Sequence, residues 1–188
     1  MGSASVLAFK AHELNRRDFL RMLSGMAAMV AIPAMGSQSD PQAWPLWLRR
    51  GGDEFRFDAK DPEGYRIAMY LLRDVQAGRY GYPHPRLLYL VSWAQAWLAM
   101  HSFHVPFDAT SGLRLPSTNN RIEGAARASL HLPDPNWRFY ALDFRARYLD
   151  AAYTAKLMRA VGMGGVGLYW QRDFVHADVG RRRDWQGA

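Results

Sequence analysis

The order of the predicted secondary-structure elements restricts the fold of this chain more than any other feature. Residues 62–77 are predicted to form a helix, because Asp61-Pro62-Glu63 is a typical helix start. Residues 84–98 repeat apolar side chains at helical spacing, which predicts a second helix. The runs 164–170 and 174–178 predict two final strands. Helices early in the chain and strands late favour an α+β fold, in which a small antiparallel sheet packs against helices.

Shorter segments complete this pattern. Residues 111–120 predict a polar loop, and residues 37–53 are rich in Ser, Gln, Pro, Gly and Trp without a clear period, which indicates a linker. The other predicted elements are strands near 54–58, 105–110 and 139–145 and a helix at 151–161 that stops at Gly162.

The N-terminal segment has the pattern of a twin-arginine export signal. Arg16 and Arg17 precede a Phe-Leu pair and an uncharged run from 22 to 36. A glycine and a proline interrupt this run, which is shorter than the roughly 20 apolar residues that a membrane-spanning helix needs. The alternative is an amphipathic helix with a chance arginine pair. We therefore expect a periplasmic protein that meets the membrane only through this signal, either cleaved near residue 36 or retained as an anchor.

These patterns divide the chain into three predicted parts. They are a signal segment at 1–36, a linker with a short strand at 37–60, and a folded domain at 61–188. The length of 188 residues, with 49% apolar side chains, fits one packed domain and excludes a multi-domain machine.

Composition excludes several kinds of chemistry. The chain has no cysteine, so disulfides, thiolate metal sites, iron–sulfur clusters and cysteine nucleophiles are ruled out, and any metal must bind to His, Asp or Glu. The formal charge of +7 comes mostly from arginine, which favours carboxylate or phosphate partners. The basic run 181–183 lacks interleaved aromatic residues and follows an export signal, so a nucleic-acid partner is not expected.

Three short clusters carry imidazole or carboxylate groups: 129–131, 141–143 and 173–176. Two His and one Asp are a ligand set of catalytic zinc sites, which leave the fourth position open for water. Asp143 is central in its predicted strand, where an apolar setting makes a lone carboxylate costly unless it is paired or metal-bound. Packing alone remains an alternative, because His131 could cap a turn and His176 could pack between strands.

Eight short blocks within residues 62–185, in order and in spacing, resemble the zinc murein peptidases of the D-Ala-D-Ala metallopeptidase group, in its exported murein endopeptidase branch. The resemblance implies a metallopeptidase-like domain whose sheet carries three zinc ligands, His131, Asp143 and His176. The blocks include Ser111-Gly112-Leu113-Arg114, Ser129-Leu130-His131, Ala141-Leu142-Asp143, Phe174-Val175-His176-Ala177-Asp178 and Arg183-Asp184-Trp185.

The resemblance also implies roles for other polar residues. Asp173 lies three residues before His176 and matches the acid that acts as general base, although a loop aspartate capping a turn is the alternative. Asp178 is the rival base and fits better as a partner of a ligand imidazole. Arg114 is expected to bind a substrate carboxylate or polarised carbonyl, and Ser129 to hydrogen-bond near a ligand or to substrate.

One departure from the family pattern concerns the spacing of the first two ligands. His131 and Asp143 are twelve positions apart, about five more than in the family, and the extra residues fall within 132–137. Two prolines and an asparagine there fit a surface loop that leaves both ligands in place. The same loop could instead reshape or block the cleft.

The sequence therefore predicts a Zn²⁺-dependent hydrolase that cleaves amide bonds in peptidoglycan peptide stems or cross-links. Whether it acts as an endopeptidase or a D,D-carboxypeptidase remains open at this point. One alternative is a catalytically silent murein-binding protein whose metal site is occluded by the loop 132–137. Another is a structural envelope protein in which the three clusters serve packing alone.

Overall fold

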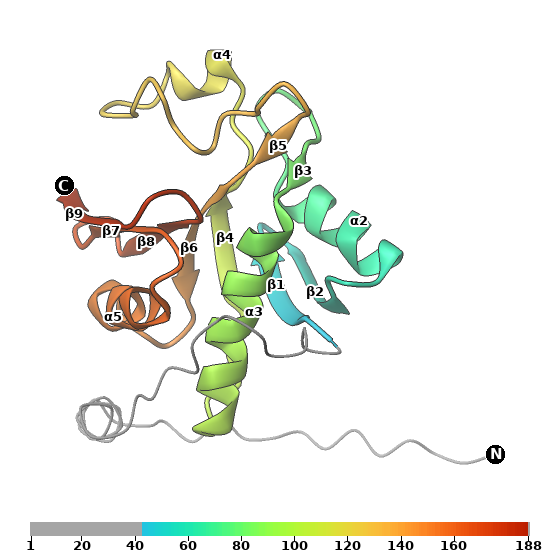
Figure 1. Ribbon diagram of the computed structural model, residues 1–188, viewed down its shortest axis with the longest axis vertical. Helices are drawn as coiled ribbons and strands as arrows, with labels where there is room; N and C mark the ends of the chain where they lie inside the picture. The colour runs from blue at the N-terminus through green and yellow to red at the C-terminus, as the bar shows by residue number, and fades with distance from the viewer. Residues whose placement is uncertain (1–42, 188) are drawn as a thin grey trace. The chain divides into compact units, whose positions relative to one another are not determined.

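The computed structural model describes residues 43–187, and a seven-stranded sheet organises them (Figure 1). The strand order is β2-β1-β4-β6-β8-β7-β9, and neighbours are antiparallel except for the pairs β1–β4 and β7–β9. The sheet strands are β1 Pro45–Arg50, β2 Asp53–Asp58, β4 Phe107–Ser111, β6 Ala141–Ala146, β7 Gly165–Tyr169, β8 Phe174–Asp178 and β9 Arg183–Gly187.

Helices pack on this sheet, and a second, two-stranded sheet lies beside it. The helices are α2 Pro62–Leu71, α3 Pro85–Met100, α4 Pro116–Asn119 and α5 Ala151–Val161, and the small sheet pairs β3 Tyr82–Pro83 with β5 Arg138–Phe139. Helix α3 contacts β1 and α5, and α5 contacts β6, β7 and β8. The expected α+β class, with helices against a mainly antiparallel sheet, is confirmed.

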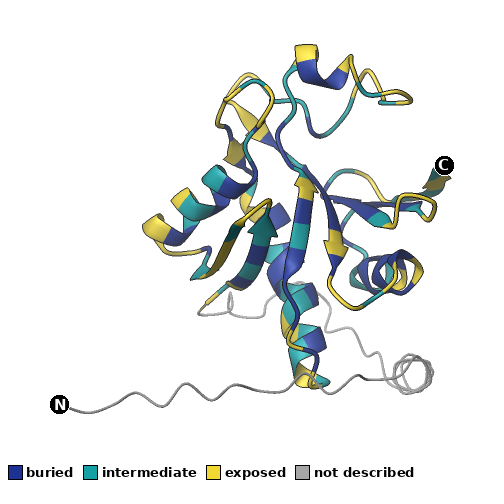
Figure 2. Cartoon of the chain, turned by 180° about the vertical axis from the view of Figure 1, so that it is seen from behind, coloured by how far each residue is buried: buried dark blue, intermediate teal, exposed yellow. Residues whose placement is uncertain are grey.

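The two faces of the central strands differ in chemistry. Side chains alternate along β6, so Leu142, Phe144 and Ala146 share one face and Asp143 lies on the other. The apolar set is buried, and Phe144 stacks on Phe107 of β4 with ring centroids 4.7 Å apart. Strands β6 and β8 are almost wholly buried (Figure 2). The apolar face therefore belongs to the core, and the opposite face can carry a polar site.

Two helices, α3 and α5, begin where the sequence predicts, and α5 also ends there. His84 precedes α3, and its Nδ1 accepts a hydrogen bond from the Arg86 N–H at 3.2 Å. Asp150 caps α5 in the same way through the Tyr153 N–H, at 2.9 Å. Helix α5 ends at Gly162, whose φ of +66° lies in the left-handed region that glycine adopts without strain. Local capping signals therefore fixed these boundaries.

Helix α2 is shorter than predicted and ends at Leu71 instead of residue 77. Its last carbonyls are taken by groups that are distant in sequence. The Leu113 N–H donates to the Leu72 carbonyl at 2.8 Å, and the Arg50 guanidinium donates to the carbonyls of Leu71 and Arg73. Long-range hydrogen bonds therefore replace the further helical turns.

The prediction of a linker at 37–53 is wrong over residues 45–50, which form β1. This strand pairs with β2 and β4, and its side chains Leu46 and Leu48 are buried. Strand β9 is likewise an element that the sequence did not indicate, and its residues alternate between half-buried and exposed, so it has no buried apolar face. The short strand predicted at 54–58 is present as β2.

No helix within residues 43–187 is long and apolar enough to cross a membrane. The predicted twin-arginine signal at 1–36 lies outside the described residues.

Candidate metal centre

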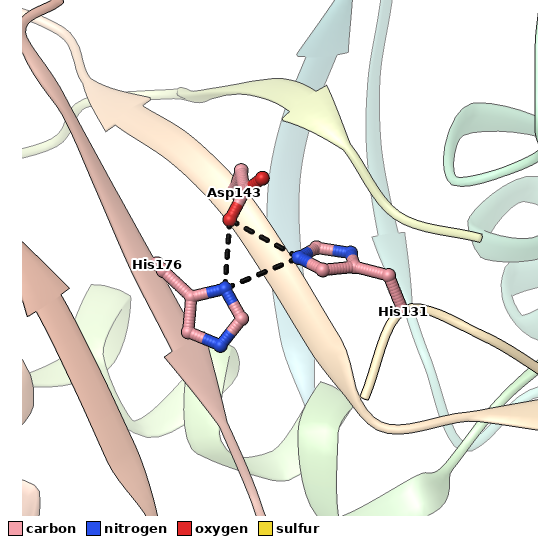
Figure 3. A group of neighbouring side chains, drawn as sticks. All are labelled: His131, Asp143 and His176. Atoms are coloured by element: carbon pink, nitrogen blue, oxygen red, sulfur yellow. Dashed lines mark hydrogen bonds and ion pairs between the residues drawn. The ribbon is translucent and has the colours of Figure 1, made fainter. Parts of the chain in front are cut away.

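Three segments bring His131, Asp143 and His176 together (Figure 3). Asp143 and His176 face each other directly across the antiparallel pair β6–β8, so their side chains share a face of the sheet. His131 comes from a turn between α4 and β5, not from a strand. The sheet therefore carries two of the three predicted ligands, and a turn supplies the third.

The turn that holds His131 is fixed by backbone hydrogen bonds on both sides. The Arg114 N–H donates to the His131 carbonyl at 2.9 Å, and the Tyr140 N–H donates to the Leu130 carbonyl at 2.8 Å. Ser129 contributes locally, because its Oγ accepts from the His131 N–H at 3.3 Å. Ser129 thus stabilises the turn that presents the imidazole.

The donor atoms of the three side chains form a compact triangle. His131 Nε2 lies 3.2 Å from Asp143 Oδ1 and 3.1 Å from His176 Nδ1, and His176 Nδ1 lies 2.8 Å from Asp143 Oδ1. All three residues are buried, with exposed fractions of 1%, 4% and 7% for His131, Asp143 and His176. Two imidazoles and a carboxylate, all removed from water, thus converge on one point.

Each imidazole has its second ring nitrogen bound to an acceptor outside the triangle. His131 Nδ1 lies 2.6 Å from the Gly112 carbonyl, and His176 Nε2 lies 2.8 Å from Asp178 Oδ2. Both partners can only accept, so these nitrogens carry protons. The other nitrogen of each ring can then offer a lone pair to a cation, an arrangement typical of metal-binding histidines.

Charges in the triangle fit a cation site. Burial raises the pKa of Asp143, but the charge and hydrogen bond of His131, followed by those of His176, outweigh burial and hold that pKa well below its usual range. Burial lowers the pKa of His131, and Asp143 offsets only part of this effect. Burial also lowers the pKa of His176, but the hydrogen bonds to Asp143 and Asp178 outweigh it and raise that pKa. Asp143 is therefore ionised, as a metal ligand must be.

Asp178 anchors His176 from behind. The Asp178 carboxylate is fully buried and accepts from the backbone N–H groups of Gly165 at 3.0 Å and Gly180 at 2.9 Å. The Arg183 guanidinium donates two further hydrogen bonds, from Nη1 to Asp178 Oδ1 at 3.1 Å and from Nη2 to Asp178 Oδ2 at 2.7 Å. Burial raises the pKa of Asp178, but the hydrogen bonds from His176, Gly165 and Arg183 outweigh burial and lower that pKa to about 2. With both oxygens engaged, Asp178 orients the imidazole and is poorly placed to act as a base.

Strand β9 supplies two supports whose role the sequence did not reveal, although both residues belong to a block that carries the family resemblance. Arg183 and Trp185 are two residues apart and share a face of the strand. Arg183 binds Asp178, and the Trp185 ring lies beside His176 with centroids 5.1 Å apart. Only the parallel pairing of β9 with β7 brings these side chains to the site.

Replacing Asp178 by asparagine should lower zinc affinity by roughly 10–100-fold, the usual effect of removing the partner of a metal-binding histidine. The change weakens the acceptor that holds the His176 Nε2–H and removes the charge opposite Arg183. Competition with a chelator of known affinity measures the effect. Asp184→Asn is the matched control, because Asp184 pairs with Arg159 on the exposed side of β9, away from the triangle. Equal zinc affinity in Asp178→Asn and the wild type would show that Asp178 does not support the ligand.

Arg114 lies at the edge of the triangle. It forms an ion pair through Nη2 with Asp143 Oδ2, and its Nε donates to the Ser111 Oγ at 2.7 Å. The loop behind it is fixed by the Leu115 N–H, which donates to Asp74 Oδ2 at 2.7 Å. The structure thus brings the predicted substrate-binding arginine to the site, where it contacts the carboxylate of a candidate ligand.

The structure does not bring the Asp173 carboxylate into the triangle. Asp173 precedes β8 with a φ of +49°, and its Oδ1 accepts from the Ala151 N–H at the start of α5, at 3.1 Å. Its neighbours Arg172 and Phe174 line the cleft described next, and Arg145 donates to the Asp173 carbonyl at 2.8 Å. Asp173 therefore lies at the rim of the site, as an exposed residue.

An open cleft of about 950 Å³ leads to Asp143 and Arg114. None of the residues 132–137 is among its lining residues in the part of the chain that the structure describes, so this loop does not occlude it. The cleft wall is basic on balance, because three aspartates, Asp53, Asp74 and Asp143, stand against five arginines: Arg50, Arg73, Arg114, Arg145 and Arg172.

The triangle fits a zinc ion. Tetrahedral zinc with bonds of about 2.0–2.1 Å to nitrogen and oxygen sets neighbouring donors about 3.3 Å apart. The donors here lie 2.8–3.2 Å apart, so a small outward movement would accommodate the ion. Two imidazoles and one carboxylate, without thiolate, match the ligand set of catalytic zinc sites.

The chain belongs to the Peptidase M15 family, whose sequence model matches residues 68–178. The matched region contains His131, Asp143 and His176 together with Arg114 and Asp173. The family resemblance drawn from the short sequence blocks is therefore confirmed, and the chain is a member of a peptidase family.

Two curated relatives cover almost the whole chain. The chain is 29% identical over 187 residues to the peptidoglycan L,D-endopeptidase MepK of Escherichia coli K12, and the match covers 92% of this chain and 98% of the relative. It is 26% identical over 188 residues to the probable peptidoglycan L,D-endopeptidase MepK of Haemophilus influenzae, with 93% and 97% covered. No solved structure gives a significant match.

Proposed function

We propose that the protein is a zinc-dependent endopeptidase that hydrolyses amide bonds in peptidoglycan cross-links, with the L,D type as its preferred bond. The convergence of three metal-donor atoms, one of them from Asp143 in the wall of an arginine-lined cleft, carries this proposal. The names of the relatives support the substrate and the bond type. Carboxylates of the peptide stems complement the basic wall of the cleft.

His131, Asp143 and His176 would hold the zinc ion. Bound there, zinc would supply a Lewis acid that polarises the scissile carbonyl and makes a water acidic enough to attack near neutral pH. The buried triangle keeps the donors in place, and Asp178 with Arg183 holds the His176 ring against rotation. The protein's part is thus to present fixed donors at the wall of an open cleft.

We assign the proton transfer to Asp173. One oxygen of its carboxylate would accept the proton of the attacking water and later give it to the leaving amine nitrogen. In the structure the carboxylate accepts from the Ala151 N–H, and a hydrogen bond to a charged group contributes about 1.5–3 kcal/mol, which sets the cost of turning the carboxylate toward the cleft. The cleft-lining neighbours of Asp173 support this assignment.

Arg114 would hold the substrate beside the scissile bond. A guanidinium has several N–H donors in a fixed plane, and Nε and Nη2 are used by Ser111 and Asp143. The remaining donors can bind a substrate carboxylate or the carbonyl oxygen as negative charge develops on it. The contact with Asp143 keeps this donor group within reach of the triangle.

Digestion of purified sacculi tests the proposed function. The zinc-loaded protein should convert cross-linked muropeptide dimers into monomers, with L,D-linked dimers disappearing before D,D-linked ones, as followed by chromatography and mass spectrometry. His131→Ala is the inactive control. Zinc-loaded protein that binds sacculi but leaves every cross-link intact would instead support a catalytically silent murein-binding protein.

We also propose delivery to the periplasm by the twin-arginine route. Arg16→Lys combined with Arg17→Lys keeps the charge but removes the arginine pair, so the variant should stay in the cytoplasm. Cell fractionation with immunodetection measures the distribution. Normal delivery of the variant to the periplasm would reject this route and favour a general secretory signal.

A further inference from the structure

A second hollow lies beside the end of α2 and is lined by exposed aromatic side chains. It has a volume of about 360 Å³, and Tyr80, Tyr82 and Trp137 line it together with Arg79 and Met69. The three aromatic residues are 51%, 48% and 45% exposed. Large aromatic rings held at the surface around a hollow are costly to solvate and typical of ligand-binding surfaces.

The aromatic residues are held by backbone pairing and are not on a loose loop. Strands β3 and β5 pair in parallel, the Tyr82 N–H donates to the Trp137 carbonyl at 2.8 Å, and the His84 N–H donates to the Phe139 carbonyl at 2.9 Å. Asp134 closes the turn, since its Oδ1 accepts from the Arg138 N–H at 2.9 Å. Trp137 has a φ of +61°, a conformation that L side chains rarely adopt. The extension 132–137 thus builds a rigid mount for Trp137.

This hollow adjoins the cleft of the metal centre. Gly81 packs on Leu113, because a Cβ at Gly81 would lie 3.1 Å from a methyl carbon of Leu113, and Leu113 lines the cleft. Asp74 also lines the cleft, and its backbone exchanges two hydrogen bonds with that of Arg79, at 2.9 and 3.1 Å. A substrate that leaves the cleft along residues 74–79 therefore reaches the aromatic residues directly.

We propose that Tyr80, Tyr82 and Trp137 form a subsite for amino-sugar rings of the glycan strand that carries the peptide being cut. The inference rests on the proposed function and names a second part of the same substrate. It assigns a purpose to the extension between His131 and Asp143, which positions Trp137 outside the cleft.

The chemistry of the hollow favours a sugar over an apolar peptide or a lipid. A pyranose ring has a face of C–H groups that packs on the electron-rich face of an aromatic ring, and polar edges that need hydrogen bonds. Tyrosine hydroxyls and the Arg79 guanidinium can bind such edges, including acetyl carbonyls and any carboxylate on the sugar. The cationic side chain at the rim matches the anionic character of the polymer.

Titration of the zinc-loaded protein with chitotetraose, a soluble chain of N-acetylated sugars without peptide, tests the subsite. Calorimetry or chemical-shift changes should show saturable binding. Trp137→Ala and Tyr82→Ala should each weaken binding at least tenfold, with unchanged thermal unfolding midpoints. Tyr80→Ala tests the third aromatic ring of the hollow. Because Tyr80 lies outside the paired strands, this variant leaves the β3–β5 pairing intact. Tyr148→Ala, a 76% exposed tyrosine in the turn before α5, is the matched control and should bind as the wild type does.

A second readout separates this subsite from the catalytic proposal. Trp137→Ala and Tyr82→Ala should slow hydrolysis of sacculi at least tenfold at low substrate, while cleavage of a glycan-free cross-linked peptide keeps the wild-type rate. Chitotetraose binding that persists in His131→Ala would support the subsite even if no hydrolysis were found. No saturable binding by the wild type, equal binding by Trp137→Ala and Tyr82→Ala, or adsorption to lipid vesicles in place of sugar would overturn the proposal.

Discussion

Replacing His131 or His176 by alanine is expected to abolish zinc binding and peptidoglycan hydrolysis together. Each imidazole supplies one of the three donor atoms of the buried triangle, and these atoms lie 2.8–3.2 Å from one another. Removing a donor leaves two, and catalytic zinc sites have three protein ligands. The loss of affinity should exceed the ~100-fold upper range found when only the partner of a ligand is removed.

Metal analysis of the purified variants and muropeptide release from sacculi measure the two effects in parallel. His101→Ala is the matched control, because the His101 ring packs on Trp97 at the end of α3 and its Nδ1 bonds the Trp97 carbonyl at 2.9 Å. This control should keep one zinc per chain and full activity. Stoichiometric zinc in His131→Ala would remove His131 from the ligand set.

Replacing Asp173 by asparagine should lower turnover at least ~100-fold, the usual scale of general acid–base assistance, while zinc binding stays at the wild-type level. Asparagine keeps the shape of the side chain and its acceptor oxygen for the Ala151 N–H, so the start of α5 should be undisturbed. The amide cannot take the proton of the attacking water. The effect should therefore appear in turnover and leave substrate binding largely unchanged.

Steady-state cleavage of a soluble cross-linked peptide, measured together with zinc content, separates the two roles of the aspartates. Asp173→Asn should lose turnover with zinc retained, whereas Asp178→Asn should lose zinc affinity first. Full activity in Asp173→Asn, with turnover lost in zinc-loaded Asp178→Asn, would show that Asp178 is the base and that Asp173 serves only the start of α5.

Local signals in the sequence predicted the elements that depend on local physics. The helix at 151–161 has the predicted bounds because Asp150 and Gly162 act on neighbouring backbone groups. The end of α2 was missed, since it is decided by Leu113 and Arg50, which are distant from it in sequence. Strand β1 was missed for a related reason. Its six residues are held as a strand by pairing with β2 and β4, and the sequence of the segment alone does not show that pairing.

Some residues of the candidate site could likewise be predicted from the sequence, and others could not. Residue type left packing open as an alternative, and the family resemblance selected His131, Asp143 and His176 as candidate ligands, which the fold brings together. The supports from β9 could not be predicted, because Arg183 reaches Asp178 only through the parallel pairing of β9 with β7.

The aromatic hollow was also beyond prediction from the sequence. Its residues 80–82 and 137 are more than fifty positions apart, and the sheet that joins them has two residues in each strand. Such short pairing leaves no periodic pattern, since alternation needs a longer run to be seen. The extension at 132–137 is the surface loop that the sequence predicted, and it leads into β5 without lining the cleft.

Zinc titration of the metal-free wild type, with bound metal and hydrolysis of sacculi followed in the same samples, tests the central claim most directly. The site has one set of donors, so hydrolysis should be absent in chelator-treated protein, should rise with added zinc and should saturate at about one zinc per chain. Full hydrolysis by protein that contains no zinc or other divalent metal would contradict the account.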